Sequence, residues 1–252
     1  MSLQTTFTPA DFEALAQTDL SGTTCVVLDI LRATSSMITA LANGAEQILP
    51  VATIEEALAA KAEHPEALLC GERDGLRITA AQTGGTEFDL GNSPREYTAE
   101  IVTGKTLITT TTNGTRALRA CANAEHTLVA SFLNLTATTD YLRTAKPSHL
   151  VIVCGGTYEE AALEDTLAAG AIADALWDLF DEVEDSAQLA RALHQSHGEN
   201  LEQSIWLAKN ARHLLDLPDL AGDVEFCIQQ DIYSFIAMLK PDGVVEVCPP
   251  DS

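Results

Sequence analysis

Basic residues are scarce in this chain of 252 residues. It has 14 Lys and Arg against 37 Asp and Glu, and its formal net charge is −23 at pH 7. Such a surface repels nucleic acid and anionic membranes, which argues against both as partners. A small anion is repelled as well, so a pocket for one needs its own basic residues or a bound cation. The composition therefore favours a divalent metal ion at any anion-binding site.

Long apolar runs and cysteine clusters are also missing. No apolar segment approaches the ~20 residues of a membrane-spanning helix, and no charged-then-apolar targeting signal stands at the N-terminus. The six cysteines are widely spread without a C-x-x-C pair, which excludes a zinc ribbon and a redox or haem motif. We therefore expect a cytoplasmic protein with one large domain or two closely packed ones.

The common catalytic and nucleotide-binding motifs are absent too. The sequence contains no G-x-x-x-x-G-K-[ST], no G-x-G-x-x-G and no G-x-S-x-G. Asp29 is followed two positions later by Leu31, which excludes the Asp-x-Asp of haloacid-dehalogenase phosphatases. Cys154 has Glu160 where a thiolate phosphatase needs Arg. The pair His194 and His197 is better explained as a solvated helix face than as a metal site.

What the chain does have is an alternation of apolar strand-length runs with helical patterns. This alternation predicts a three-layer α/β/α fold around a mostly parallel or mixed sheet, with helices concentrated towards the C-terminus. The predicted strands are 24–29, 48–51, 67–70, 106–109, 127–130 and 149–156, with a terminal hairpin at 235–239 and 244–247. The predicted helices are 9–17, 34–43, 53–63, a short one from Ser93, 116–122, 134–145, one from the capping box at 157–160 to about 180, and a broken helical region at 185–233. Residues 76–91 are predicted as a long loop.

Residues 24–51 and 105–130 resemble each other as strand, polar turn, helix and strand, at an offset of roughly 80 residues. If this is an internal repeat, two helix N-termini face one pocket. The alternative is chance similarity between two Ala-rich α/β units.

The sharpest local signal is the turn after the first of these strands, where Asp29 is followed by Arg32 and a hydroxyl-rich helix start. A carboxylate alone would repel phosphate. The pair makes sense if Asp29 holds a metal ion or attacks phosphorus while Arg32 and the helix N–H groups bind the oxygens. The competing interpretation is an Asp cap paired with an Arg.

Similar polar groups follow the other predicted strands. Because the carboxyl ends of parallel strands meet at one edge of a sheet, we expect these groups to come together. They are Glu72 and Arg73; Asn92 and Ser93; Asn113, Gly114 and Thr115; and Cys154 and Gly155, with Glu164 and Asp165 on the next helix. Taken singly, each has a simpler explanation: a surface ion pair, a β-prone strand end, a core cysteine or a solvated helix face.

Several longer motifs, in order, resemble the 2-phosphosulfolactate phosphatase family (ComB). The motifs are residues 29–35, 71–73, 88–94 and 110–115, Glu164 and Asp165 before Ala169 and Gly170, and residues 222–227 with Asp231. The resemblance implies a single ComB-like domain over 1–252. It also implies a Mg²⁺-dependent phosphatase that converts (2R)-2-phospho-3-sulfolactate to 3-sulfolactate and phosphate, a step towards coenzyme M. Residues 76–87 depart from the pattern, being longer and lacking a Gly before Phe88.

Under this interpretation, metal-assisted phosphoryl transfer divides the site residues into two groups. Asp29, Glu72 and Asp165 are expected to hold Mg²⁺, with Asp29 as metal ligand or nucleophile and Arg32 as a further catalytic group. The expected substrate-binding residues are Arg32, Thr34, Arg73, Asn92, Ser93, Asn113, Gly114, Thr115, Cys154 and Gly155.

Three alternatives stay open. Family members also occur in organisms with no evident use for coenzyme M, so the substrate could be another small phosphorylated acid. A phosphatase of an unrelated phosphoester and a protein that binds a small dianion without turnover are the other two. A homodimer is a further expectation, made without a specific sequence signal.

Overall fold

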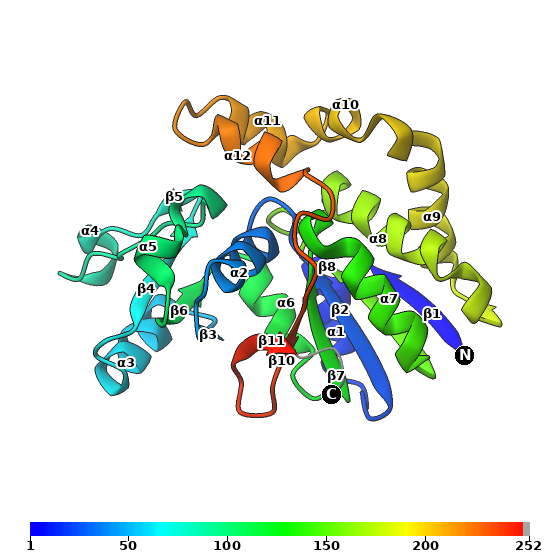
Figure 1. Cartoon of the computed structure of the whole chain (residues 1–252), viewed down its shortest axis with the longest axis horizontal. Helices are drawn as coiled ribbons and strands as arrows, with labels where there is room; N and C mark the ends of the chain where they lie inside the picture. Colours follow the sequence, from blue (N-terminus) through cyan, green and yellow to red (C-terminus); the bar gives the residue numbers. More distant parts are fainter. Residues whose placement is uncertain (249–252) are drawn as a thin grey trace.

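A single large sheet organises the computed structural model, which describes residues 1–248 (for Glu199, the backbone alone). The sheet has 11 strands in the order β5-β4-β6-β3-β11-β10-β7-β2-β8-β1-β9. The strands are β1 Ser2–Thr6, β2 Thr23–Leu28, β3 Gln47–Pro50, β4 Leu68–Arg73, β5 Leu76–Arg77, β6 Thr106–Thr110, β7 His126–Ala130, β8 His149–Cys154, β9 Glu182–Val183, β10 Ile236–Leu239 and β11 Val245–Cys248. Figure 1 shows the helices on both sides of it.

The helices alternate with strands at first and gather late in the chain. They are α1 Pro9–Leu15, α2 Ala33–Ala42, α3 Ile54–Glu63, α4 Ala80–Thr83, α5 Ala99–Val102, α6 Gly114–Ala120, α7 Leu135–Ala145, α8 Leu163–Ala175, α9 Asp185–His197, α10 Leu201–Trp206, α11 Lys209–Leu215 and α12 Ala221–Cys227. Short 3₁₀ turns are η1 Pro94–Glu96, η2 Phe132–Asn134, η3 Trp177–Leu179 and η4 Gly198–Asn200. The expected concentration of helices towards the C-terminus is confirmed. None of the helices in residues 1–248 combines the length and apolarity that a membrane crossing requires.

The sheet is mixed, because an antiparallel hairpin lies between two mainly parallel halves and the edge strand β5 is antiparallel to β4. β2 pairs in parallel with β7 and β8, and β3 pairs in parallel with β6. The β10–β11 hairpin is antiparallel and joins the halves, β10 to β7 and β11 to β3. The hairpin was predictable from its two apolar runs, whereas its central position depends on contacts distant in sequence.

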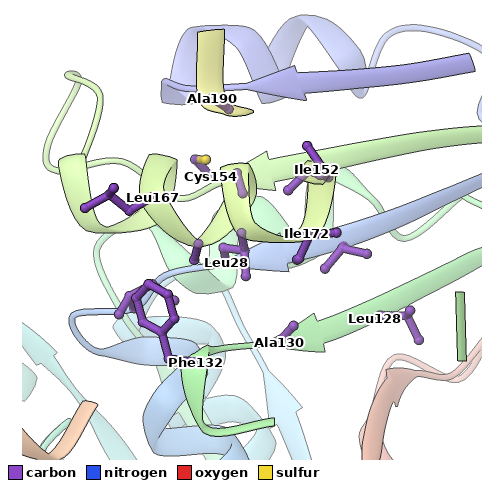
Figure 2. Packing of buried hydrophobic residues seen from close by; sticks show 14 of the residues in the cluster. Leu28, Leu128, Ala130, Phe132, Ile152, Cys154, Leu167, Ile172 and Ala190 are labelled. Carbon is purple, nitrogen blue, oxygen red and sulfur yellow. The ribbon is translucent and has the colours of Figure 1, made fainter. Parts of the chain in front are cut away.

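Helices cover both faces of the sheet, which confirms the three-layer architecture. On the β2–β7–β8 half, alternate residues point to opposite faces. Leu28, Ile152 and Leu128 pack with α7, α8 and α9 in one core, which Figure 2 shows. Val27, Val129 and Val153 pack on the other face with α1, α2 and α6. A smaller cluster under α3 completes the β4–β6 end of the molecule.

The two repeat-like segments interlock. Segment 24–51 forms β2-α2-β3 and segment 105–130 forms β6-α6-β7, so that β2 lies beside β7 and β3 beside β6. The N-termini of α2 and α6 consequently meet: a Cβ built on Gly114 would lie 2.5 Å from the Cβ of Ala33. Both the repeat itself and the assignment of 1–252 to one domain stay predictions.

The predicted helix start at the 157–160 capping box is wrong. Thr157 and Glu160 instead pair as an isolated antiparallel bridge, and Tyr158 has a positive φ of 54°. A tight turn of this kind cannot continue into a helix. The helix α8 begins only at Leu163 and ends at Ala175.

Three further predictions need correction. β4 continues through Arg73, so residues 71–73 belong to the strand rather than to the turn that ends it. The predicted loop at 76–91 contains β5 and α4. The first strand, β1, was not predicted, because four of its five residues are polar and it gains its place by pairing in parallel with β8 and β9, which lie far away in sequence.

Candidate functional site

A pocket of about 190 Å³ lies where β2, β4, β6 and β8 end. One side, the strand-end wall, comes from the turns after these strands and the segment before η1. Its residues are Asp29, Leu31, Arg32, Glu72, Asp74, Gly75, Asn92, Thr112, Asn113, Gly156, Thr157 and Tyr158. The other side, the α11 wall, consists of Lys209, Asn210, His213 and Leu214. Figure 1 shows α10, α11 and α12 at the end of the sheet where β2 passes into α2.

Asp29 occupies the first residue after β2 and is 8% exposed. Its Oδ1 accepts a hydrogen bond of 3.1 Å from the N–H of Ala33, in the first turn of α2. Burial raises the pKa of Asp29 to about 6, and the charge of Glu72 raises it too, while the Ala33 N–H, Arg32 and the Gly114 N–H lower it. The N–H of Ala33 therefore serves this carboxylate and the N–H of Thr34 serves the carbonyl oxygen of Asp29, so these two donors of the α2 N-terminus are not free for a phosphate.

Glycines let the neighbouring segments approach Asp29 closely. A Cβ on Gly114 would lie 2.7 Å from the Asp29 Oδ2, and one on Gly155 would lie 3.1 Å from its Cβ. A side chain at position 114 would need backbone movement at the site. Gly114 and Gly155 thus shape the site from behind and do not line the pocket.

Arg32 lines the pocket with a side chain that is only 2% exposed. Its Nη1 donates to Asp223 at 2.6 Å, and its Nη2 donates to the carbonyl oxygen of Gly75 at 2.5 Å. An arginine carries five N–H donors in a planar fork, so these two bonds fix the plane and leave donors for a ligand.

Glu72 stands beside Asp29 in the pocket lining and is 7% exposed. One oxygen accepts the backbone N–H of Thr112 at 2.8 Å and its hydroxyl at 3.0 Å; the other accepts the N–H of Gly75 at 2.8 Å. The oxygen that accepts from Gly75 has a second lone pair for a further partner, whereas both lone pairs of the other oxygen are taken up by Thr112. Two buried carboxylates that repel each other in one pocket form an environment suited to a cation.

Asp165 is a poor candidate for a metal ligand, because it does not line the pocket. Its Oδ1 accepts the N–H of Ile30 at 2.8 Å and its Oδ2 accepts the N–H of Gly156 at 3.0 Å. Burial raises its pKa well above the usual value, and Asp29 and Glu164 raise it as well. Asp165 holds the turns after β2 and β8 together.

Glu164, which neighbours Asp165, is 1% exposed and has a side-chain oxygen, Oε2, without a hydrogen-bond partner. Burial raises its pKa to about 7, and the charge of Asp29 also raises it. It is a buried carboxylate behind the site and, like Asp165, does not belong to a solvated helix face.

Two of the predicted amide residues do line the pocket, namely Asn92 and Asn113. The Asn113 Nδ2 donates to the carbonyl oxygens of Gly156 at 3.1 Å and Tyr158 at 2.8 Å. These bonds hold the turn after β8 against the turn after β6.

The remaining predicted residues lie outside the pocket lining. Arg73 donates to the Thr110 hydroxyl at 3.0 Å and to the carbonyl oxygen of Glu72 at 2.6 Å, because it alternates to the other side of β4. Ser93 donates to Asp223 at 2.6 Å. The hydroxyls of Thr34 and Thr115 bond within their own turns, to the carbonyl oxygens of Asp29 and Thr111.

Cys154 is a core residue, which was the alternative interpretation of a cysteine at the end of an apolar strand. It is fully buried within the cluster around α8, and burial raises the pKa of its thiol well above the usual value. It is therefore unavailable as a thiolate nucleophile or a substrate contact.

Sequence reasoning missed the α11 wall. Lys209 donates to Glu160 at 2.7 Å, and both side chains are largely exposed, at 59% and 68%. The Asn210 side chain donates to the carbonyl oxygen of Leu31, which ties α11 to the turn after β2. No spacing in the helical region 185–233 marked these residues, because they meet the strand ends only through the fold.

No group of three or more His, Cys, Asp and Glu side chains in residues 1–248 is arranged to hold a metal ion by itself. The predicted triad is thus reduced to Asp29 and Glu72. Magnesium is commonly held by one or two carboxylates with waters and substrate phosphate completing the shell, so this pair fits such an ion.

Comparison with known proteins matches the chain to one family. The family model described as 2-phosphosulpholactate phosphatase matches residues 10–242. The chain belongs to the 2-phosphosulfolactate phosphatase family. A relative named probable 2-phosphosulfolactate phosphatase from Pseudothermotoga lettingae is 41% identical over 226 residues, which are 89% of this chain and 93% of the relative.

Two further relatives carry the same name. The one from Thermotoga petrophila is 40% identical over 86% of this chain and 88% of its own length. The one from Caldanaerobacter subterraneus is 38% identical over 93% of this chain and 94% of its own length. The resemblance seen in the motifs is thereby confirmed along most of the chain.

Proposed function

We propose that this protein is a phosphoric monoester hydrolase that releases phosphate from (2R)-2-phospho-3-sulfolactate, leaving 3-sulfolactate. The observation that carries the proposal is the meeting of two buried carboxylates, Asp29 and Glu72, with the buried guanidinium of Arg32 in one small pocket. The names of the relatives supply the substrate.

Arg32 is the group that binds phosphate oxygens. Its guanidinium is charged at every physiological pH and offers paired donors that match a phosphate. Its side chain is nearly excluded from water, which strengthens the interaction with developing charge in the transition state. Asn92 and Asn113 supply further polar contacts in the lining.

Asp29 and Glu72 would together hold Mg²⁺. When bound, the ion would neutralise the phosphate and act as a Lewis acid on its oxygens. The hydrogen bonds from Ala33 to Asp29 and from Thr112 and Gly75 to Glu72 keep both carboxylates oriented toward the same space. Asp29 as the nucleophile remains the alternative to this role.

The α11 wall accounts for a substrate with a second anionic group. Lys209 and His213 lie across the pocket from the strand ends, and Lys209 brings a positive charge into a strongly acidic protein. A sulfonate or carboxylate would bind there while the phosphate contacts Arg32. The small volume of about 190 Å³ suits a three-carbon acid better than a nucleotide.

A step towards coenzyme M stays a prediction of the family resemblance, and a cytoplasmic location stays a prediction of the composition. A homodimer stays a prediction without a specific sequence signal. They do not affect the chemistry of the pocket. Another small phosphorylated acid would use the same groups.

The deciding experiment is a panel of small phosphoesters assayed for phosphate release with Mg²⁺ and with EDTA. We expect fastest release from 2-phospho-3-sulfolactate and loss of activity in EDTA. A preference for compounds without a sulfonate would replace the substrate but keep the reaction. No release from any compound would favour a protein that only binds a dianion.

A further inference from the structure

A buried carboxylate next to the pocket, that of Asp223 in α12, accepts hydrogen bonds from two arginines. Its side chain is fully buried, and it accepts hydrogen bonds from three residues. These come from Arg32 Nη1 at 2.6 Å, Ser93 Oγ at 2.6 Å and Arg95 Nε at 2.7 Å. The carboxylate itself does not line the pocket.

A buried ion pair of this kind is informative because burying charge is costly. Removing both charges from water gains net energy only when geometry and hydrogen bonding are nearly complete. Here the Asp223 oxygens are shared among three donors, and Arg32 also bonds the Gly75 carbonyl. The ion pair with Asp223 fixes Arg32, which lines the pocket. Fixing this side chain explains the buried ion pair better than a contribution to stability does.

The second bond of Arg32 extends this constraint to the metal-binding side. The carbonyl oxygen of Gly75 accepts from Arg32, and the N–H of Gly75 donates to Glu72 at 2.8 Å. A chain of hydrogen bonds therefore runs from Asp223 through Arg32 and Gly75 to Glu72. It joins α12 to two strand ends that lie far from it in the sequence.

We propose that Asp223 is a positioning residue that holds the Arg32 guanidinium in the orientation that binds the phosphate group. The proposal rests on the proposed function for the identity of the ligand. It assigns the C-terminal helices a role in phosphate binding, although α12 contributes no residue to the pocket lining.

Arg95 offers a matched control within the same network. It bonds the same Asp223 carboxylate through Nε, but its side chain is 43% exposed and does not line the pocket. Replacing Arg95 removes one donor from Asp223 and leaves Arg32 in place. A purely structural network would respond in similar ways to the loss of either arginine.

The test measures the affinity of the full-length protein for inorganic phosphate by calorimetry with Mg²⁺ present, for four variants and the wild type. We expect Asp223→Asn to weaken phosphate binding at least about tenfold, because a buried pair loses its geometry, and Arg95→Gln to change it by less than about twofold. Arg32→Gln should weaken phosphate binding as much as Asp223→Asn does. The double variant Arg32→Gln/Asp223→Asn should bind phosphate no more weakly than Arg32→Gln alone. Equal effects of Asp223→Asn and Arg95→Gln, or additive effects in the double variant, would overturn the proposal.

Asp223→Asn leaves a buried guanidinium without its partner and could fail to fold. Arg32→Lys keeps a positive charge opposite the buried Asp223 carboxylate, but an ammonium cannot bridge Asp223 and Gly75 as the planar fork does. We expect this variant to lose about tenfold in phosphate affinity, and a loss below about twofold would show that charge alone suffices and overturn the proposal. Calorimetry does not depend on turnover, so absence of phosphatase activity would refute the proposed function while leaving this test intact.

Discussion

The two walls of the pocket are built in opposite ways. The strand-end wall presents Asp29, Arg32 and Glu72, which are all less than a tenth exposed. Asp29 and Glu72 accept hydrogen bonds from backbone N–H groups, and Arg32 donates to Asp223 in α12 and to the carbonyl oxygen of Gly75. The α11 wall presents Lys209, which is 59% exposed and paired with Glu160, which is 68% exposed. Buried, oriented groups suit the bond-breaking chemistry, since they need no reorganisation during the reaction. Exposed groups suit recognition of the rest of the substrate.

The largest effect that this contrast predicts comes from Glu72→Gln. The change removes a charge from the predicted metal site, and kcat/KM for phosphate release should fall by about a thousandfold, with a higher Mg²⁺ concentration for half-activation. Glu66→Gln is the matched control, because it makes the same carboxylate-to-amide change at an exposed glutamate before β4 that lies outside the pocket lining; it should stay within about threefold. Equal losses in the two variants would remove the distinction between Glu72 and its surroundings.

Arg32→Gln is expected to have the second-largest effect. Its kcat/KM should fall by about a hundredfold, because the variant lacks the main phosphate-binding charge. Arg73→Gln changes an arginine that the sequence equally suggested but that lies outside the pocket lining. Its activity should remain within about threefold of wild type. Steady-state kinetics on both variants checks the assignment, and a larger loss in Arg73→Gln would contradict it.

Lys209→Gln is predicted to have a smaller and selective effect. For a substrate with a second anionic group, KM should rise about fivefold to tenfold, while kcat changes little, because an exposed charge contributes modestly to binding. A phosphoester without that group should be hydrolysed at an unchanged rate. Arg212→Gln, on the same helix but outside the lining, serves as control. Loss of activity on both substrate types would place Lys209 in the chemical step.

Glu164→Gln tests the energetic cost of the carboxylates behind the strand-end wall. The pKa of Glu164 is raised from 4.5 to about 7, so between these values the folded protein binds more protons than the unfolded chain. This group therefore makes the free energy of unfolding fall as pH rises through that window. The variant lacks the effect and should be more stable than wild type at pH 7.5 by about 1 to 3 kcal/mol.

The stability difference for Glu164→Gln should vanish near pH 4, below 4.5, where the wild-type carboxyl is protonated in both the folded and the unfolded state. Denaturant unfolding at both pH values measures it. A variant that is less stable at pH 7.5 would mean that the Oε2 of Glu164 has a partner essential to the fold.

The sequence predicted the strand-end wall because its signals are local. Asp29 and Asn113 follow apolar strands and Glu72 lies at the end of one, and parallel strands bring such positions to one edge. It could not tell which way a side chain points at that edge. Glu72 lines the cavity, whereas Arg73, the next residue, points to the other side of β4. Arg32 lines the cavity as well, whereas Asp165 accepts hydrogen bonds from backbone N–H groups outside it.

The α11 wall had no local signal at all. Lys209 and His213 lie in an ordinary solvated helical pattern and reach the pocket only because α10–α12 cross the end of the sheet. The central β10–β11 hairpin and the short strand β1 were beyond local reasoning in the same way, since their places depend on partners far away in sequence. The capping-box pattern at 157–160 shows the converse, a helix signal overridden by a tight turn.

The central claim is that the strand-end wall performs phosphate release, and Asp29→Asn tests it most directly. In one preparation, phosphate release from 2-phospho-3-sulfolactate and the binding of inorganic phosphate should both be measured. The account predicts a loss of release of about a thousandfold or more, with phosphate still bound through Arg32. Release at a rate near that of the wild type would contradict it.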